Sequence, residues 1–162
     1  MSVRRHPIAF IPGDASRAPI PIDLALVERL RTSFAMLRER GHVLGTTFYA
    51  RLFDSNPELR PLFTSDLEAQ ARKLVDALEA VVRNLEAPEA NQAMLADLGR
   101  RHVAYGARPE HYEVVARLLV ESMAEVLGSD IDARTLDEWR QAIDLVSRQM
   151  IAGARAADST DE

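Results

Sequence analysis

Residues 66–102 read DLEAQARKLVDALEAVVRNLEAPEANQAMLADLGRRH, and this stretch decides the fold class. Apolar residues recur every three or four positions on both sides of a break near Glu86–Pro88, which is the spacing of one helix face. Proline is common in the first turn of a helix. We therefore expect two helices joined by a short turn. If they fold back on each other about Glu86, Gln70 and His102 are equally far from the turn and lie at the same height.

Helical spacing recurs through the rest of the chain, whereas alternating, strand-like runs are nearly absent. Asp23 is a suitable cap for a first helix. A second helix should end near Asn56, because the residue before a proline disfavours helical backbone. The segment 57–63 is proline-rich and predicts a short corner turn. Two further helices are expected after Pro109 and around Trp139. The sequence thus predicts six substantial helices and an all-α fold.

The length of 162 residues fits one domain, and 47% hydrophobic residues suffice for one core. We expect this domain over residues 23–155, with a flexible N-terminal extension over 1–22 and a frayed tail over 156–162. No stretch is long and apolar enough to span a bilayer. The apolar run in the extension is short and broken by prolines, which argues against a signal peptide. We expect no membrane partner and a cytoplasmic location.

Charge and cysteine content exclude several classes of function. The formal net charge is −5 and the basic residues are scattered, whereas a nucleic-acid binder needs a basic patch. We therefore expect no nucleic-acid partner. The chain has no cysteine. This composition excludes disulfides, thiolate zinc sites, iron–sulfur clusters and a cysteine nucleophile.

Of the four histidines, only His102 follows a clear apolar stripe, one turn beyond Leu98, so its ring should point inward. Such a histidine is more often a core residue with satisfied hydrogen bonds than a ligand. Gln70 makes a ligand role for His102 more plausible than it would be alone, because Gln70 shares a helix face with Leu74 and faces the His102 helix. A buried amide without a partner costs about 1–3 kcal/mol. A ligand between the helices would supply a partner, and so would a neighbouring hydroxyl.

Tyr49 is a candidate for that hydroxyl. Gly45, one turn earlier, and Ala71, next to Gln70, are both small. Small residues at these points would let two helices cross with their backbones close together, which would bring Tyr49 near Gln70.

Five short motifs now stand together in order: FYARLF at 48–53, NPELRPLF at 56–63, QARKL at 70–74, LGRRHVAYG at 98–106 and PEHY at 109–112. With these spacings the chain resembles, from about Leu26 to Met150, the bacterial globins related to the haem domain of flavohaemoglobins. The resemblance implies a globin fold, a helical sandwich around haem b (iron protoporphyrin IX).

The resemblance also implies roles for individual positions. His102 matches the proximal histidine, the protein ligand to the iron. Tyr49 and Gln70 match the distal pair that donates hydrogen bonds to bound oxygen. The other matching or candidate positions are Leu74 beside the distal pair, Phe63 against the haem ring, Leu98 as a haem contact, Tyr112 on the proximal side, and Arg72 and Lys73 at the propionates. Arg72 and Lys73 are alternatively simple surface charges.

Two departures from the family pattern affect the chemistry. The family places a glutamate on its last helix, in a proximal network with the histidine and tyrosine, and the matching position here is Ala154. A negative partner makes imidazole more electron-donating, so its absence favours binding over oxygen activation. In addition, only a dozen residues follow Met150. We therefore expect a separate reductase, not an attached flavin domain.

The expected function is binding of dioxygen and other diatomic gases such as nitric oxide and carbon monoxide, for oxygen transport or, with an external reductase, nitric-oxide detoxification as a dioxygenase. The alternative is a haem-based gas or redox sensor that acts through a partner protein. A haem-free regulatory globin is a third hypothesis, against which His102 and Phe63 argue. The chain is expected to be a monomer or a homodimer.

Overall fold

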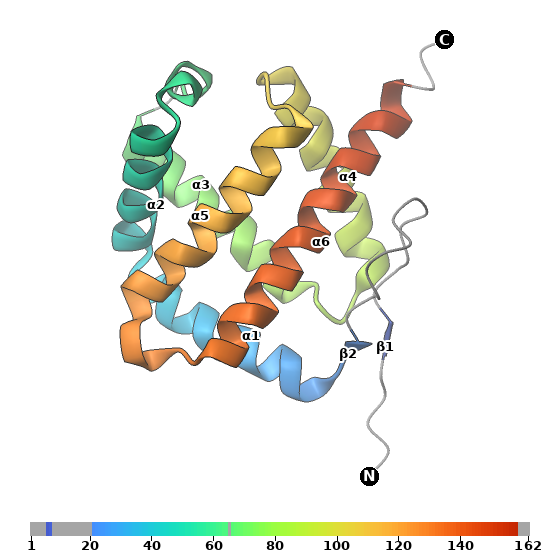
Figure 1. Ribbon diagram of the computed structural model, residues 1–162. Coiled ribbons are helices and arrows are strands. Elements are labelled where there is room, and N and C mark those ends of the chain that lie inside the picture. Colours follow the sequence, from blue (N-terminus) through green and yellow to red (C-terminus); the bar gives the residue numbers. More distant parts are fainter. Residues whose placement is uncertain (1–5, 8–20, 65, 159–162) are drawn as a thin grey trace.

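The computed structural model describes residues 6–7, 21–64 and 66–158. Its helices are α1 (Leu24–Glu39), α2 (Gly41–Ser55), the 3-10 helix η1 (Pro57–Leu62), α3 (Leu67–Arg83), α4 (Pro88–Ala104), α5 (Pro109–Leu127), the 3-10 helix η2 (Gly128–Asp130) and α6 (Ala133–Asp158). The predicted all-α class is confirmed, and six α-helices occupy the described ranges (Figure 1).

The N-terminal segment adds one feature that the sequence did not predict. Two-residue strands, β1 (His6–Pro7) and β2 (Pro21–Ile22), pair antiparallel. The rest of the expected extension, residues 1–5 and 8–20, lies outside the described residues, as do residues 159–162 of the expected tail.

Side-chain caps and prolines set the helix starts. The Asp23 carboxylate accepts a hydrogen bond from the Leu26 N–H at 2.7 Å, so the predicted cap is confirmed. Asp66 does the same for the Ala69 N–H at 2.9 Å. Pro88 and Pro109 occupy the first turns of α4 and α5, where their missing N–H groups cost nothing. The proline-rich corner is a short 3-10 helix, η1.

The main core joins α1, α2 and α5 to the first half of α6. Trp139 is almost fully buried, and its indole N–H donates to the Ser33 hydroxyl at 2.8 Å, which ties α6 to α1. The Arg29 guanidinium holds the Glu138 carboxylate with two hydrogen bonds of 2.6 and 2.8 Å. This paired arrangement is the strong geometry for an arginine and a carboxylate. α1 is therefore fixed across the base of the bundle, below α5 and α6 in Figure 1.

The helices on either side of the Glu86 turn have different packing partners. α3 packs mainly against α2, and α4 packs mainly against α6. A Cβ atom on Gly45 would lie 2.2 Å from the Ala71 Cβ, so α2 and α3 cross with backbones close together. The close crossing predicted from these two small residues is confirmed. α3 and α4 contact each other near their connecting turn, where the Asn91 side chain donates to the Val81 carbonyl at 3.4 Å and Val81 packs in one cluster with Leu95.

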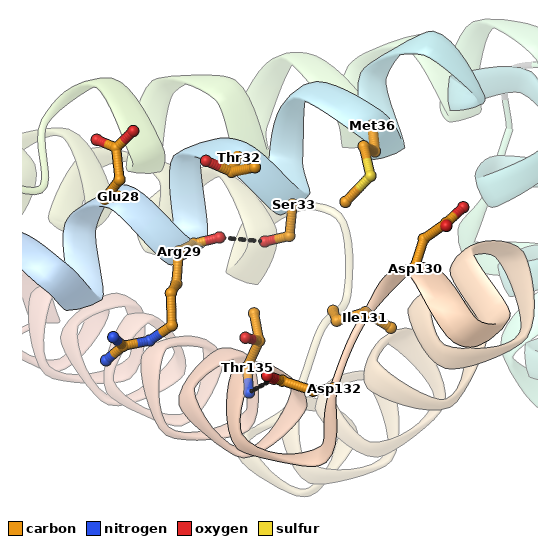
Figure 2. A pocket seen from close by; sticks show the side chains of 9 residues that line it. All are labelled: Glu28, Arg29, Thr32, Ser33, Met36, Asp130, Ile131, Asp132 and Thr135. Carbon is orange, nitrogen blue, oxygen red and sulfur yellow. Dashed lines mark hydrogen bonds between the residues drawn. The ribbon is translucent and has the colours of Figure 1, made fainter.

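A depression of about 220 Å³ lies between α1 and the start of α6 (Figure 2). Polar groups that line it already have partners: the Ser33 hydroxyl donates to the Arg29 carbonyl at 2.7 Å, and the Thr135 N–H donates to Asp132 at 2.8 Å. It lies at the base of the bundle, whereas the α4–α5 turn lies at the opposite end (Figure 1). None of its lining residues belongs to the predicted site.

None of the helices formed by the described residues combines the length and apolar character needed to cross a membrane.

Candidate functional site

The predicted distal residues meet where α2 crosses α3. Tyr49, on α2, is only 5% exposed, and its hydroxyl donates to the main-chain carbonyl of Gln70 at 3.4 Å. This is near the upper limit of a useful hydrogen bond, so it is weak. Its acceptor is the Gln70 backbone, which leaves the Gln70 side-chain amide outside this contact. The structure therefore brings Tyr49 and Gln70 together, with the phenol loosely held.

Aromatic rings surround Tyr49. Phe63, at the end of η1, approaches it edge-on at 5.4 Å between ring centroids, and Phe48 does so at 5.0 Å. Phe53 stacks on Tyr49 at 5.8 Å and meets Phe63 at 5.3 Å. The sequence analysis missed Phe53, although its position one turn after Tyr49 places both on one helix face. Together these rings fix the position of the Tyr49 ring, whereas its O–H bond can still rotate about the C–O bond.

Burial keeps the Tyr49 phenol protonated. Removal from water raises the pKa of Tyr49 from 10.0 to about 12, because the charged phenolate loses its solvation. At neutral pH the hydroxyl is therefore a hydrogen-bond donor, which is the role that a distal tyrosine needs.

The remaining predicted residues of α3 divide by exposure. Gln70 and Leu74 are half-buried, and Leu74 packs against the main core. Arg72 and Lys73 are exposed, and the Arg72 guanidinium lies 3.9 Å from the Glu68 carboxylate one turn earlier. These two cations stand on the surface of the helix that carries the distal amide.

On the proximal side, His102 lies near the end of α4 and is half-buried. Its Nδ1 is 2.8 Å from the carbonyl oxygen of Leu98, one turn earlier. A carbonyl only accepts hydrogen bonds, so the proton lies on Nδ1 and the lone pair on Nε2. Burial lowers the pKa of His102, which favours the neutral ring. A neutral imidazole whose Nδ1 is fixed by a backbone carbonyl is the usual form of a metal-binding histidine.

Two tyrosines flank His102. The ring of Tyr112, at the start of α5, is 6.4 Å from the imidazole between centroids, as the family pattern predicts. The ring of Tyr105 is 6.2 Å away and 64% exposed, and the sequence analysis did not single it out. Leu98 packs in a small second core cluster with Tyr112.

The position expected to lack a carboxylate is Ala154, which is buried on α6. Among the described residues, the imidazole hydrogen bond goes to a backbone carbonyl, not to a carboxylate. The acceptor on Nδ1 is thus a neutral carbonyl, which draws the Nδ1 proton less strongly than a carboxylate would.

Taken together, the site has two halves of different chemistry. The distal residues Tyr49, Phe63 and Leu74 belong to or pack against the larger core cluster, whereas Leu98 and Tyr112 pack with the smaller one. One half offers hydrogen-bond donors on an apolar background, and the other offers a single imidazole nitrogen. This combination suits the class of helical proteins that hold a flat metal cofactor through one protein ligand.

Comparisons with known proteins agree with this class. Residues 46–150 match the family model described as Globin. Flavohemoproteins of Rhizobium meliloti and Bordetella pertussis are 32% and 30% identical over 70% and 78% of this chain. The chain spans about a third of the length of these relatives, 29% and 32% respectively.

Two solved structures have the same fold. A bacterial globin from Campylobacter jejuni superposes with a TM-score of 0.73 at 22% identity, over 83% of this chain and 98% of the other. An engineered carbene transferase from Rhodothermus marinus, whose parent is proposed to be a nitric oxide dioxygenase, gives a TM-score of 0.74 at 28% identity, over 85% and 96%. The chain belongs to the globin family, and its globin region is similar to the globin part of bacterial flavohemoproteins.

Proposed function

We propose that the chain binds haem b through Nε2 of His102 and uses the pocket to bind dioxygen, nitric oxide and carbon monoxide. The main support for this proposal is the hydrogen bonding of the His102 ring. Its Nδ1 is tied to the Leu98 carbonyl at 2.8 Å, which leaves the Nε2 lone pair for iron. The chain has no cysteine, which excludes thioether bonds between the protein and the haem vinyl groups.

When bound, the haem would supply an iron that can bind a diatomic gas, with His102 as its protein ligand. The protein would supply hydrogen-bond donors to the bound gas. The Tyr49 hydroxyl stays protonated at neutral pH and is held by one weak bond of 3.4 Å, so it can turn toward a bound gas at little cost. The half-buried Gln70 amide provides a second donor. Donors in an apolar pocket stabilise partial negative charge better than water does.

The rings of Phe48, Phe53 and Phe63 exclude water around Tyr49. Exclusion of water strengthens the hydrogen bonds that remain and protects ferrous iron from oxidation. Leu74 adds to this apolar surface, and the exposed cations Arg72 and Lys73 on α3 are the proposed partners of the haem propionates.

Nitric-oxide detoxification is the activity we propose beyond gas binding. Nitric oxide and dioxygen combine to nitrate with the uptake of one electron, which a separate reductase would return. The flavohemoprotein names of the relatives and the nitric oxide dioxygenase proposed for the Rhodothermus marinus parent support this reading. The backbone acceptor on Nδ1 makes His102 a moderate electron donor, so we expect nitric-oxide turnover to be slower than with a carboxylate acceptor, while oxygen binding is retained.

The test is an absorption spectrum of the purified chain loaded with haem. A sharp Soret band, and its shifts on addition of carbon monoxide and of dioxygen, would support gas binding. Consumption of nitric oxide by the oxygen-bound form, with equimolar nitrate formed, would support the dioxygenase activity. A loaded protein that binds carbon monoxide but converts no nitric oxide would leave binding intact and contradict the enzymatic part.

A further inference from the structure

The position of α4, the helix that carries His102, is set mainly by its packing against α6. α4 and α6 form the most extensively packed pair of helices in the described part of the chain. Leu95 of α4 is fully buried beside Met150 of α6 in the smaller core cluster. Figure 1 shows α4 passing behind α6 along its upper half. Contacts that set the position of α4 on α6 therefore also set the position of His102.

Two glycines bring these helices together. A Cβ on Gly99 would lie 2.0 Å from the Met150 carbonyl oxygen and 2.8 Å from the Met150 Cα. A Cβ on Gly153 would lie 2.3 Å from the Ala96 Cα. Only a residue without a side chain allows backbones to approach so closely. We call this contact of Gly99, Met150, Gly153 and Ala96 the α4–α6 glycine crossing.

The crossing lies next to the iron ligand. Gly99 is three residues before His102, which places them on neighbouring positions of the helix surface. Leu98, whose carbonyl holds Nδ1 of His102, is adjacent to Gly99 in the chain. A displacement of α4 at Gly99 would therefore move the imidazole and its hydrogen-bond acceptor together.

Glycine inside a helix is unfavourable relative to alanine, so two glycines in the same crossing indicate a requirement for close approach. We propose that the α4–α6 glycine crossing positions the proximal ligand, setting the distance and angle at which His102 reaches the iron. This inference rests on the proposed haem binding. Gly99 and Gly153 are positioning residues that touch neither the haem nor a gas.

The chain offers a matched control on the distal side. A Cβ on Gly45 would lie 2.2 Å from the Ala71 Cβ, so Gly45→Ala creates a clash of similar size between α2 and α3. It makes the same chemical change at the same kind of helix crossing. It acts on the helices of Tyr49 and Gln70, and leaves α4 and α6 untouched.

The experiment compares wild type, Gly99→Ala, Gly153→Ala and Gly45→Ala as haem-loaded ferrous proteins by resonance Raman spectroscopy. We expect the iron–histidine stretching band to shift or split in Gly99→Ala and Gly153→Ala, and to be unchanged in Gly45→Ala. Haem transfer to an acceptor protein should be roughly tenfold faster or more in the first two. A wild-type band and haem-loss rate in folded Gly99→Ala and Gly153→Ala, or the same shift in Gly45→Ala, would overturn the proposal.

Two further measurements decide the outcome if the alanine variants do not fold or no haem is bound. Ala96→Gly removes a methyl group from the crossing and adds no clash, so it should broaden the band and speed haem loss; wild-type values would contradict the proposal. Hydrogen exchange of haem-free Ala96→Gly should show lower amide protection at the end of α4 than wild type, with α2 unchanged. Equal protection would also contradict it, whereas a wild type without a Soret band contradicts the proposed function itself.

Discussion

The two sides of the site are built by different means. Tyr49 on the distal side is 5% exposed and surrounded by aromatic rings from α2 and the end of η1. His102 on the proximal side is half-buried and held by a hydrogen bond within its own helix, beside a Tyr105 ring that is 64% exposed. Distal geometry thus comes from tertiary packing. Proximal geometry comes from the local form of α4 and its placement on α6.

Because the two sides are built differently, we expect substitutions on each side to change a different property. Changes on the distal side should alter how long a gas stays bound, while the haem is retained. Changes on the proximal side should alter whether and how the haem is held. The predictions below separate these two effects, from the largest to the smallest.

The largest effect is expected for the iron ligand. His102→Gly should abolish stable haem binding, because it removes the only imidazole that the site offers to the iron. Added free imidazole should restore a Soret band by filling the space that the side chain left. His111→Gly is the matched control, since the His111 ring accepts the Arg108 N–H at 3.0 Å at the start of α5. Equal haem retention in both variants would refute the proximal assignment.

Tyr49→Phe should speed dioxygen dissociation about tenfold, the equivalent of about 1.4 kcal/mol for a lost hydrogen bond to a partly charged acceptor. The ring is preserved, so haem content should not change. Stopped-flow displacement of dioxygen by carbon monoxide measures the rate. Tyr105→Phe, on the exposed ring beside His102, serves as the control and should leave the rate unaltered. An unchanged rate in Tyr49→Phe would remove Tyr49 from the distal role.

Alkaline pH tests the burial of the distal phenol. The pKa of Tyr49 is raised from 10.0 to about 12 by burial, whereas the unfolded chain ionises at the ordinary value. Above pH 10 the unfolded state loses this proton first, so stability falls as pH rises through the window from 10 to 12, by about 2–3 kcal/mol in total. Denaturant unfolding of the haem-free chain should show this loss. Tyr49→Phe should show a smaller loss, which the half-buried Tyr112 still contributes because burial raises its pKa as well. A phenol that titrates near 10 in the folded protein would contradict the packing described.

The smallest effect is expected for the surface cations of α3. Exposed ion pairs are worth about 0.2–1 kcal/mol each, so Arg72→Gln and Lys73→Gln, each made alone, should speed haem loss no more than about fivefold. High salt should reduce the difference from wild type. Arg38→Gln is the control, because Arg38 pairs with Glu79 at 2.8 Å and is not one of the predicted haem contacts. A loss of more than a hundredfold would show that these cations are main haem contacts.

Much of the fold could be predicted from local sequence patterns. Apolar spacing predicted the α-helices, the Asp23 cap was correct, and the small pair Gly45 and Ala71 predicted the close crossing of α2 and α3. The helices and the cap depend on residues that are close in sequence, and the crossing depends on a single pair of small residues. The β1–β2 pairing was not predictable, because it joins two proline-containing dipeptides without a strand pattern.

The candidate site was predictable in part. Its residues were named from helix faces and family resemblance. The structure brings Tyr49 to Gln70 as expected, whereas the contact of Phe63 with Tyr49 was not predicted. The α4–α6 glycine crossing escaped the analysis, because Gly99 and Gly153 become partners only when it is known which helices meet. The proton position on His102 also required the structure, since it depends on the direction of the Leu98 carbonyl.

A haem titration shows whether the chain holds haem through His102. Ferric haem is added stepwise to the haem-free protein and to His102→Ala, and the Soret absorbance is recorded. We predict a sharp band that saturates at equimolar haem in the wild type, and a weak, shifted band without a clear end point in His102→Ala. Identical titrations of the two proteins, or no Soret band in the wild type, would contradict the account.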